Sequence, residues 1–303
     1  MFDCIVVGGG PAGLSAAVYF ARQKTKFALF TGLLGGQVIT SSDVENYLGI
    51  HQTSGVQLVE LFNKHLDDYK KAMELHEGEK ITSITRTSGG FSVQTDRGAY
   101  PTKTILVATG ADHRMLNVPG ETELNMKGVS YCATCDAPLF AGKLVHVIGG
   151  GNSAMDASLL LAQYAREVHV VTVNAELVGD EVMKRNCLSD PKIKVHVSTK
   201  TTGFKGGASL ESILFVGADG KEIVESSEGA FIEIGLMPQS GFIDFVGKDK
   251  GGQILVDAHN RTNVEGVWAA GDVTNVAYKQ ISVAVGEGAK AALDVISYLQ
   301  KLS

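Results

Sequence analysis

The amino-acid sequence has few of the features that mark secreted, membrane-spanning or nucleic-acid-binding proteins. Its 303 residues include only four cysteines, six prolines and one tryptophan, and the net charge is −6. An acidic chain is poorly suited to bind nucleic acid or an anionic membrane surface. No apolar run reaches the roughly 20 residues needed to cross a bilayer, and nothing after Met1 resembles a signal peptide. We therefore expect no nucleic-acid partner, no membrane association and a cytoplasmic location.

The scarcity of cysteine excludes a fold held together by many disulfides. Cys4 and Cys187 are isolated, whereas Cys132 and Cys135 stand together in "CATCD". Three interpretations are open for this pair. A structural disulfide across so short a loop would contribute only about 2 kcal/mol, and a zinc site would need a second CxxC or a His-x-x-x-His pair, which the sequence lacks. The pattern favours a redox-active pair and predicts no metal site.

Glycine, by contrast, is abundant, with 36 residues. Two segments, residues 2–32 and 143–173, each read as strand, glycine turn, helix and strand. The turns are Gly8-x-Gly10-x-x-Gly13 and Gly149-x-Gly151-x-x-Ala154, the fingerprint of a dinucleotide-binding βαβ unit. Such a turn lets backbone N–H groups at a helix N-terminus approach a pyrophosphate. The four strands are expected at residues 4–7, 27–30, 144–148 and 168–173.

The order of these segments predicts one domain inserted into another. After each βαβ unit an apolar strand ends in a glycine turn, at residues 104–114 and 229–240, and a last helix begins near Ile281. Residues 89–107 alternate between apolar and polar side chains, as in a β meander. We predict an α/β fold of two Rossmann-like three-layer nucleotide-binding domains. The first comprises residues 1–113 and 244–303, and the second, residues 114–243, carries the cysteine pair.

Six stretches along the chain carry a family resemblance: "GGGPAGLSAA", "GGQVITSSDVENYLG", "ATGA", "YCATCDAPLF", "GGGNSAMDA" and "AAGDV…YKQI". Together they resemble the low-molecular-weight thioredoxin reductases, class II of the pyridine nucleotide-disulfide oxidoreductases. The motifs "ENYLG" and "GEGAKAAL" are similar to those of the flavoprotein subunit of alkyl hydroperoxide reductase. The resemblance implies a homodimeric flavoprotein that reduces the disulfide of a thioredoxin-like protein or of a redox protein in a peroxidase system.

The resemblance also implies bound FAD in the first domain and NADH or NADPH in the second. Asp272 would meet the ribityl–phosphate part of FAD, with a helix N-cap as its alternative role. Thr31 stands where an acid often reads a ribose hydroxyl. The other residues that match the family's FAD contacts are Gly8, Gly10, Pro11, Ala12, Gly13, Gly35, Gly36, Gln37, Asn46, Gly271, Lys279, Gln280 and Ile281. Those that match its second nucleotide site are Gly149, Gly151, Asn152, Ser153 and Ala154.

Catalytic roles follow from the same resemblance together with thiol chemistry. Cys135 would receive electrons from the flavin, and Cys132 would attack the partner's disulfide through a mixed disulfide. Asp136 would be the general acid–base that protonates the departing thiolate. The alternative for Asp136 is a cap for the "APLF" turn, and the two roles are compatible.

The electron donor is less well specified by the sequence. NADPH-dependent relatives carry "HRRxxxR" after the second strand of the second domain, where arginines clamp the 2′-phosphate. This sequence has "TVNAELV" instead, with Thr172, Asn174 and Val178 at matching positions. NADH, NADPH held by Lys184 or Arg185, and a ferredoxin or deazaflavin donor stay open. A small-dithiol oxidase and a non-catalytic flavin-binding protein are the alternative functions, and the intact "CATCD" favours the reductase.

Overall fold

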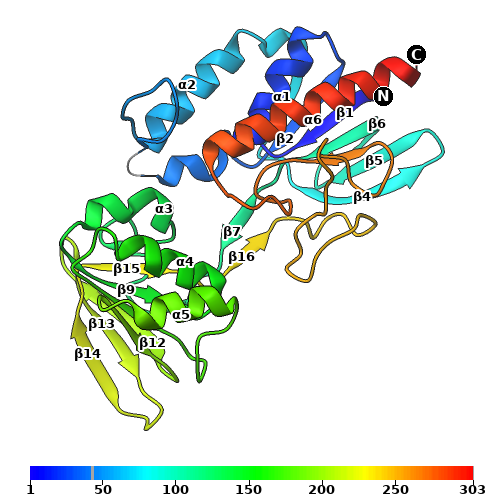
Figure 1. Ribbon diagram of the computed structural model, residues 1–303. Coiled ribbons are helices and arrows are strands. Elements are labelled where there is room, and N and C mark those ends of the chain that lie inside the picture. Colours follow the sequence, from blue (N-terminus) through cyan, green and yellow to red (C-terminus); the bar gives the residue numbers. More distant parts are fainter. Residues whose placement is uncertain (42–43, 303) are drawn as a thin grey trace. The chain divides into compact units, whose positions relative to one another are not determined.

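The computed structural model describes residues 1–41 and 44–302 and contains two compact units (Figure 1). Unit 1 comprises Met1–Asp112 and Met237–Ser303, and unit 2 comprises His113–Leu236. Unit 2 is therefore inserted into the chain of unit 1. Each unit contains helices and a sheet with parallel strands. The predicted α/β fold class is confirmed.

The second junction between the units lies earlier in the chain than the sequence predicted. We expected it at residues 243–244, and it falls at residues 236–237. The physical reason is that Ile243 is fully buried in a core of unit 1. The preceding Phe242 carbonyl also accepts a hydrogen bond from the Ile84 backbone N–H (3.2 Å). At the two junctions the chain forms short strands that pair with each other, β7 (Ala111–His113) and β16 (Leu236–Pro238).

A seven-stranded sheet forms the middle layer of unit 1 (Figure 1). Its order is β3-β2-β1-β6-β5-β4, with β17 paired to β6. The strands β1, β2, β3, β6 and β17 run parallel, whereas β4 and β5 continue the sheet as an antiparallel ribbon. The strands are β1 (Phe2–Val7), β2 (Phe27–Thr31), β3 (Met73–Glu77), β4 (Ile81–Thr87), β5 (Gly90–Thr95), β6 (Ala99–Val107) and β17 (Val267–Ala269).

Side chains alternate along a strand, so the two faces of this sheet have separate cores. Cys4 and Val6 of β1 lie in the core beneath the helices, whereas Ile5 and Val7 lie in the core shared with β4, β5 and residues 242–264. The helices of unit 1 are α1 (Pro11–Arg22), α2 (Gly55–Asp67) and α6 (Ile281–Leu302), with 3-10 turns η1 (Gly36–Thr40) and η2 (Lys70–Ala72).

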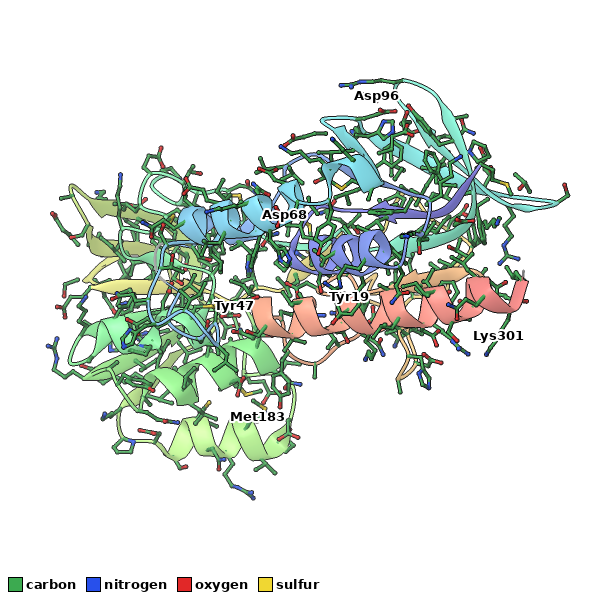
Figure 2. All side chains as sticks on the ribbon, turned by 90° about the horizontal axis from the view of Figure 1, so that it is seen from above. Tyr19, Tyr47, Asp68, Asp96, Met183 and Lys301 are labelled. Atoms are coloured by element: carbon green, nitrogen blue, oxygen red, sulfur yellow. A yellow bond between two sulfur atoms is a disulfide. The ribbon has the colours of Figure 1, made fainter. Side chains whose placement is uncertain are left out.

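Helices α1 and α6 come from opposite ends of the chain and lie side by side (Figure 1). Gly288 of α6 makes the close approach possible, because a Cβ atom there would lie 2.0 Å from the Ala12 carbonyl oxygen. Tyr19 of α1 packs against the same core (Figure 2). The contact holds the C-terminal helix over the start of α1.

Unit 2 is also built in three layers. A five-stranded parallel sheet in the order β11-β10-β9-β15-β8 lies between helices on one face and the antiparallel sheet β12-β13-β14 on the other. Met183 of α5 packs against the core on the helical face (Figure 2). The strands are β8 (Val129–Ser130), β9 (Leu144–Ile148), β10 (Glu167–Val171), β11 (Ile193–His196), β12 (Lys200–Gly206), β13 (Leu210–Val216), β14 (Glu222–Ser226) and β15 (Gly229–Ile232). The helices are α3 (Ala133–Asp136), α4 (Asn152–Leu161) and α5 (Glu181–Ser189), with the 3-10 turn η3 (Ala137–Phe140).

Local sequence explains where several elements begin and end. The strands β9 and β10 ("LVHVI" and "EVHVV") are rich in valine, which suits a sheet covered on both faces. Ser54 and Gln57 form a capping box at the start of α2. Among residues 1–41 and 44–302, no helix combines the length and the apolar composition needed to span a bilayer.

The packing of α1 on α6 gives a test of the fold. We expect Gly288→Ala to lower the free energy of unfolding by about 1–3 kcal/mol, because the new methyl group meets backbone that cannot move aside. The matched control is Gly286→Ala on the same helix, where no described atom lies within 4 Å of the new Cβ. That change should stabilise by about 0.5–1 kcal/mol. Urea unfolding followed by circular dichroism measures both, and equal effects would contradict the packing.

Candidate active site

The first glycine turn lies between β1 and α1, and three of its glycines are required by packing within unit 1. Gly8 has φ +113°, and a Cβ there would lie 2.2 Å from the Ala108 carbonyl oxygen. A Cβ at Gly9 would lie 2.5 Å from the Thr31 hydroxyl, and one at Gly13 would lie 1.8 Å from the Gly8 carbonyl oxygen. These glycines therefore bring strand and helix together.

Gly10 is different, because no described atom lies within 4 Å of its ideal Cβ position. It is the N-cap residue of α1, with Pro11 as the first helical residue, and no side chain of the described residues caps this end of the helix. No described atom thus fills the space beside Gly10 at the start of α1. This is the geometry that binds a phosphate at a helix N-terminus.

Two further segments assigned to FAD by resemblance converge on this turn. The Gly35 N–H donates to the Gly9 carbonyl (2.7 Å), and a Cβ on Gly36 would lie 3.2 Å from the Gly10 Cα. Gly271, after β17, has φ +76°, and its N–H donates to the Glu287 carboxylate (3.0 Å). A Cβ on Gly271 would lie 3.1 Å from that of Ala12. The fold therefore brings three distant stretches to one place.

Asp272 offers a polar group suited to a ligand. Its side chain is half-buried, and within the part of the chain that the structure describes no donor forms a hydrogen bond with it. Burial raises the pKa of its carboxyl, although the nearby Lys279 partly opposes this. The Lys279 ammonium itself donates to the Thr274 carbonyl (2.6 Å). A carboxyl oxygen that has no donor among the described residues, next to Gly271, is suited to accept hydrogen bonds from ligand hydroxyls.

The remaining residues of the first set have partners within unit 1. Asn46 donates its amide to Gln280 (3.2 Å), next to Ile281 at the start of α6. Gln37 donates to the Ala111 carbonyl (2.5 Å) and to Asp112 (2.8 Å). In the "GGQVITSSDVENYLG" stretch, Ser42 and Asp43 lie outside the described residues. The residues that could hold FAD are thus all contributed by unit 1, and they fit the group.

The second glycine turn, in unit 2, repeats the geometry of the first. Gly149 has φ +144°, and a Cβ there would lie 2.2 Å from the Glu233 carbonyl oxygen. A Cβ at Gly150 would lie 2.2 Å from the Thr172 hydroxyl, as Gly9 lies against Thr31 in unit 1. Gly151 again has open space and caps α4 with its backbone alone, as far as the described residues extend. Ala154 is fully buried in place of the third glycine.

The loop where relatives carry the phosphate clamp folds over this turn. The Val178 N–H donates to the Gly150 carbonyl (2.7 Å), and the Asp180 N–H donates to the Asn152 side chain (2.8 Å). Lys184 forms an ion pair with Glu176 (2.5 Å). One of the two basic residues that could have replaced the clamp is therefore already paired with an acid.

The cysteine pair lies in the same unit as this second turn. Cys132 and Cys135 are joined by a disulfide, with Cα atoms 5.3 Å apart, at the start of the short helix α3. Cys135 is exposed and Cys132 is half-buried. The Ser130 hydroxyl donates to the Asp136 carboxylate (2.6 Å) and accepts a hydrogen bond from the Cys132 N–H (3.1 Å). Ser130 thus connects Asp136 to the backbone of the disulfide.

Glu233 is a second carboxyl beside the disulfide, and sequence reasoning missed it. It follows β15, and its carboxyl accepts a hydrogen bond from the Ala133 N–H, between the two cysteines. Burial raises the pKa of Glu233 to about 7, and repulsion from Asp156 acts in the same direction, while the Ala133 bond opposes them. The only sequence signal was an acid within the apolar run "GAFIEIG". Glu233 can therefore hold a proton near neutral pH next to the disulfide.

Comparison with known proteins identifies the family. Residues 2–288 match the family described as pyridine nucleotide-disulphide oxidoreductase. The chain belongs to this family. Because the chain belongs to this family, it is an oxidoreductase enzyme. Membership of the family also supports redox chemistry with FAD. The resemblance seen in the sequence motifs is confirmed.

Individual relatives of the oxidoreductase have several names. It is 40% identical to the alkyl hydroperoxide reductase F subunit of Pseudomonas putida over 100% of this chain. It is 38% identical to an NADH dehydrogenase of Bacillus subtilis (strain 168) over 98% of this chain. The chain spans only 59% and 58% of the length of these two relatives. The solved thioredoxin reductase of Streptococcus pyogenes MGAS5005 is 32% identical, with a TM-score of 0.93 and 99% of each chain covered.

The contrast between Gly10 and Gly13 predicts two different kinds of defect. Gly10→Ala adds a methyl group only to the open space in front of α1, so we expect normal folding and FAD affinity reduced at least about 10-fold. Gly13→Ala instead meets backbone and should lower the free energy of unfolding by about 1–3 kcal/mol. Flavin absorbance after gel filtration and urea unfolding separate the two. Undiminished FAD binding by Gly10→Ala would exclude this turn as the pyrophosphate site.

Glu233 predicts a pH dependence of stability. Its pKa is about 7 in the folded protein against an ordinary value of 4.5, so folding favours the protonated form. The stabilisation is complete below about pH 4.5 and is lost as pH rises through about 7. Between these values the wild type should lose up to about 3 kcal/mol relative to Glu233→Gln. Unfolding at a series of pH values measures this, with Glu211→Gln, an exposed glutamate of unit 2, as control. Parallel profiles for wild type and Glu233→Gln would refute the assignment.

Proposed function

We propose that this oxidoreductase reduces the disulfide of a thioredoxin-like protein, or of a redox protein in a peroxidase system, through Cys132 and Cys135. The observation that carries the proposal is the disulfide at the start of α3, in the same unit as the second dinucleotide turn and with two carboxyls close to it. The relatives' names support both kinds of partner. The proposal includes a homodimer and a cytoplasmic location, as the sequence predicted.

Each cysteine has a separate role in the proposed reaction. FAD, when bound to unit 1, supplies a two-electron carrier between the donor and the disulfide. Two electrons and two protons convert the Cys132–Cys135 disulfide to a dithiol, and Cys135 is the sulfur that accepts the electrons. The Cys132 thiolate then attacks the partner's disulfide, and Cys135 resolves the mixed disulfide. The partner leaves as a dithiol, and the internal disulfide forms again.

The two carboxyls account for the protons in this cycle. Asp136 is held by Ser130 close to the cysteine backbone, and we assign it the protonation of the thiolate that departs when the disulfide opens. Glu233 lies at the N-terminus of α3, where its charge opposes thiolate formation and its protonated form does not. The state of Glu233 therefore influences which cysteine form is available near neutral pH.

We propose NADH as the donor, bound at the turn of Gly149 and Gly151. The loop that covers this turn has neutral side chains at Thr172, Asn174 and Val178, which do not repel a ribose but offer no clamp for a 2′-phosphate. The ion pair of Lys184 with Glu176 makes NADPH less favoured. The name of the Bacillus relative also agrees with NADH. The missing clamp equally suits a ferredoxin or deazaflavin donor, which is the second candidate.

Two half-reactions test the proposal. We expect anaerobic NADH to bleach the flavin of wild type, Cys132→Ser and Cys135→Ser alike. Reduction of a thioredoxin disulfide should fall at least about 1000-fold in both variants, because neither can form the internal disulfide. Transfer from NADH to ferricyanide should persist, and Cys187→Ala, a buried free thiol of unit 2, is the control.

The outcomes separate the alternatives. Disulfide reduction by either serine variant at the wild-type rate would exclude dithiol chemistry. Faster bleaching by micromolar NADPH than by NADH would overturn the donor assignment. Bleaching by reduced ferredoxin, with neither nicotinamide effective, would establish the second candidate.

A further inference from the structure

Three histidines of unit 2 lie on one face of its parallel sheet. His146 of β9 and His169 of β10 are paired in register, and His196 follows on β11. They face the antiparallel sheet, away from the helices, and Glu225 of β14 reaches them from that sheet. The sequence assigned these residues no function. The cluster is also separate from the cysteine pair and the glycine turn, so it is not part of the proposed reaction.

The polar atoms of this cluster converge closely. The Glu225 Oε2 atom lies 3.2 Å from His146 Nε2 and 3.1 Å from His169 Nδ1. These three atoms all lie within 4.8 Å of one another. His196 Nε2 is 3.3 Å from His169 Nδ1. Bonds of 2.0–2.1 Å to a tetrahedral zinc ion place neighbouring ligand atoms about 3.3 Å apart, so the spacing is that of a ligand set.

Ser227 fixes the orientation of the His146 ring. The Ser227 hydroxyl donates its hydrogen to the Gly229 carbonyl (2.8 Å), so it must accept from His146 Nδ1 (2.9 Å). The other ring nitrogen, Nε2, is therefore the one that faces the Glu225 carboxylate (3.2 Å) and is available as a ligand atom.

Glu167 orients the His169 ring in the same way. Its carboxylate lies 3.1 Å from His169 Nε2 and also pairs with Lys194, so Nε2 donates to it. Nδ1 is therefore the nitrogen that faces the same Glu225 oxygen (3.1 Å).

We propose that His146, His169 and Glu225 bind a divalent transition-metal ion of the zinc class. The cation would bind the two ring nitrogens and the carboxylate oxygen that face one another, with His196 or a water molecule as the fourth ligand. Two imidazole nitrogens and one carboxylate oxygen are donors that suit Zn²⁺. Ser227 and Glu167 hold the other nitrogen of each ring, as outer-shell partners of metal-ligating histidines do.

The site would be structural. The ligands come from both sheets of unit 2, so a bound ion would join β9 and β10 to β14. Glu225 keeps 29% of its side chain exposed, whereas His146 is fully buried. An ion can therefore reach the site from the Glu225 side. Binding to the folded form alone would raise the melting temperature in proportion to the logarithm of the zinc concentration.

The test uses the untagged, FAD-loaded, oxidised full chain after removal of metal with EDTA. Oxidation keeps Cys132 and Cys135 in their disulfide, so these sulfurs cannot bind the probe. We expect dialysis against micromolar ZnCl₂ to leave one zinc per chain by elemental analysis and to raise the melting temperature. Glu225→Gln should weaken zinc binding at least about 10-fold, as loss of even an outer-shell partner does.

The same variant also separates loss of metal binding from loss of folding. Glu225→Gln keeps the length of the side chain and a group that can hydrogen-bond the histidine rings, so without metal we expect it to melt close to wild type. The control is His76→Gln in unit 1, because His76 contacts two carboxylates, those of Glu79 (2.8 Å) and Glu74 (2.9 Å), in place of a second histidine. It should leave zinc binding unchanged. Equal zinc retention by wild type and Glu225→Gln would overturn the proposal.

Discussion

A helix N-terminus can bind a diphosphate only if its backbone N–H groups stay free, and both units are organised around this requirement. Gly10 and Gly151 leave open space in front of α1 and α4. Neighbouring glycines such as Gly8, Gly13 and Gly149 instead allow close packing. Strand, turn and helix approach one another so closely there that a Cβ atom would not fit. A helix end that no side chain caps is open to water or to a ligand, and its repetition at both turns supports ligand binding.

The surroundings of the cysteine pair follow from its place in unit 2. Cys132 is the N-cap residue of the short helix α3, and two carboxyls lie close to its first turn. Asp136 comes from the same helix by way of Ser130, whereas Glu233 comes from the end of β15, about one hundred residues later. Disulfide reduction consumes protons, and these two groups have environments that differ enough to give them separate roles.

The parallel sheet of unit 2 serves different purposes at its edge and on its face. The glycine turn lies at the carboxyl ends of its strands, where open α/β sheets generally bind their ligands. Its face toward β12, β13 and β14 bears the histidines, where the register of β9 and β10 sets His146 beside His169. A metal bound there would join the two sheets of the unit.

The sequence by itself determined the features that depend on local pattern. The two glycine turns, the strands beside them, the start of the last helix at Ile281 and the cysteine pair are all encoded within short stretches, because turn geometry and strand alternation are local. Only the tertiary structure decided what depends on strand register and on packing between distant segments. It brought Glu233 to α3, Glu287 to Gly271 and Glu225 to two histidines, and it placed Ile243 in unit 1. The spacing of residues along the chain does not predict these contacts. They depend on which strands pair and on which faces of the sheets are buried against each other.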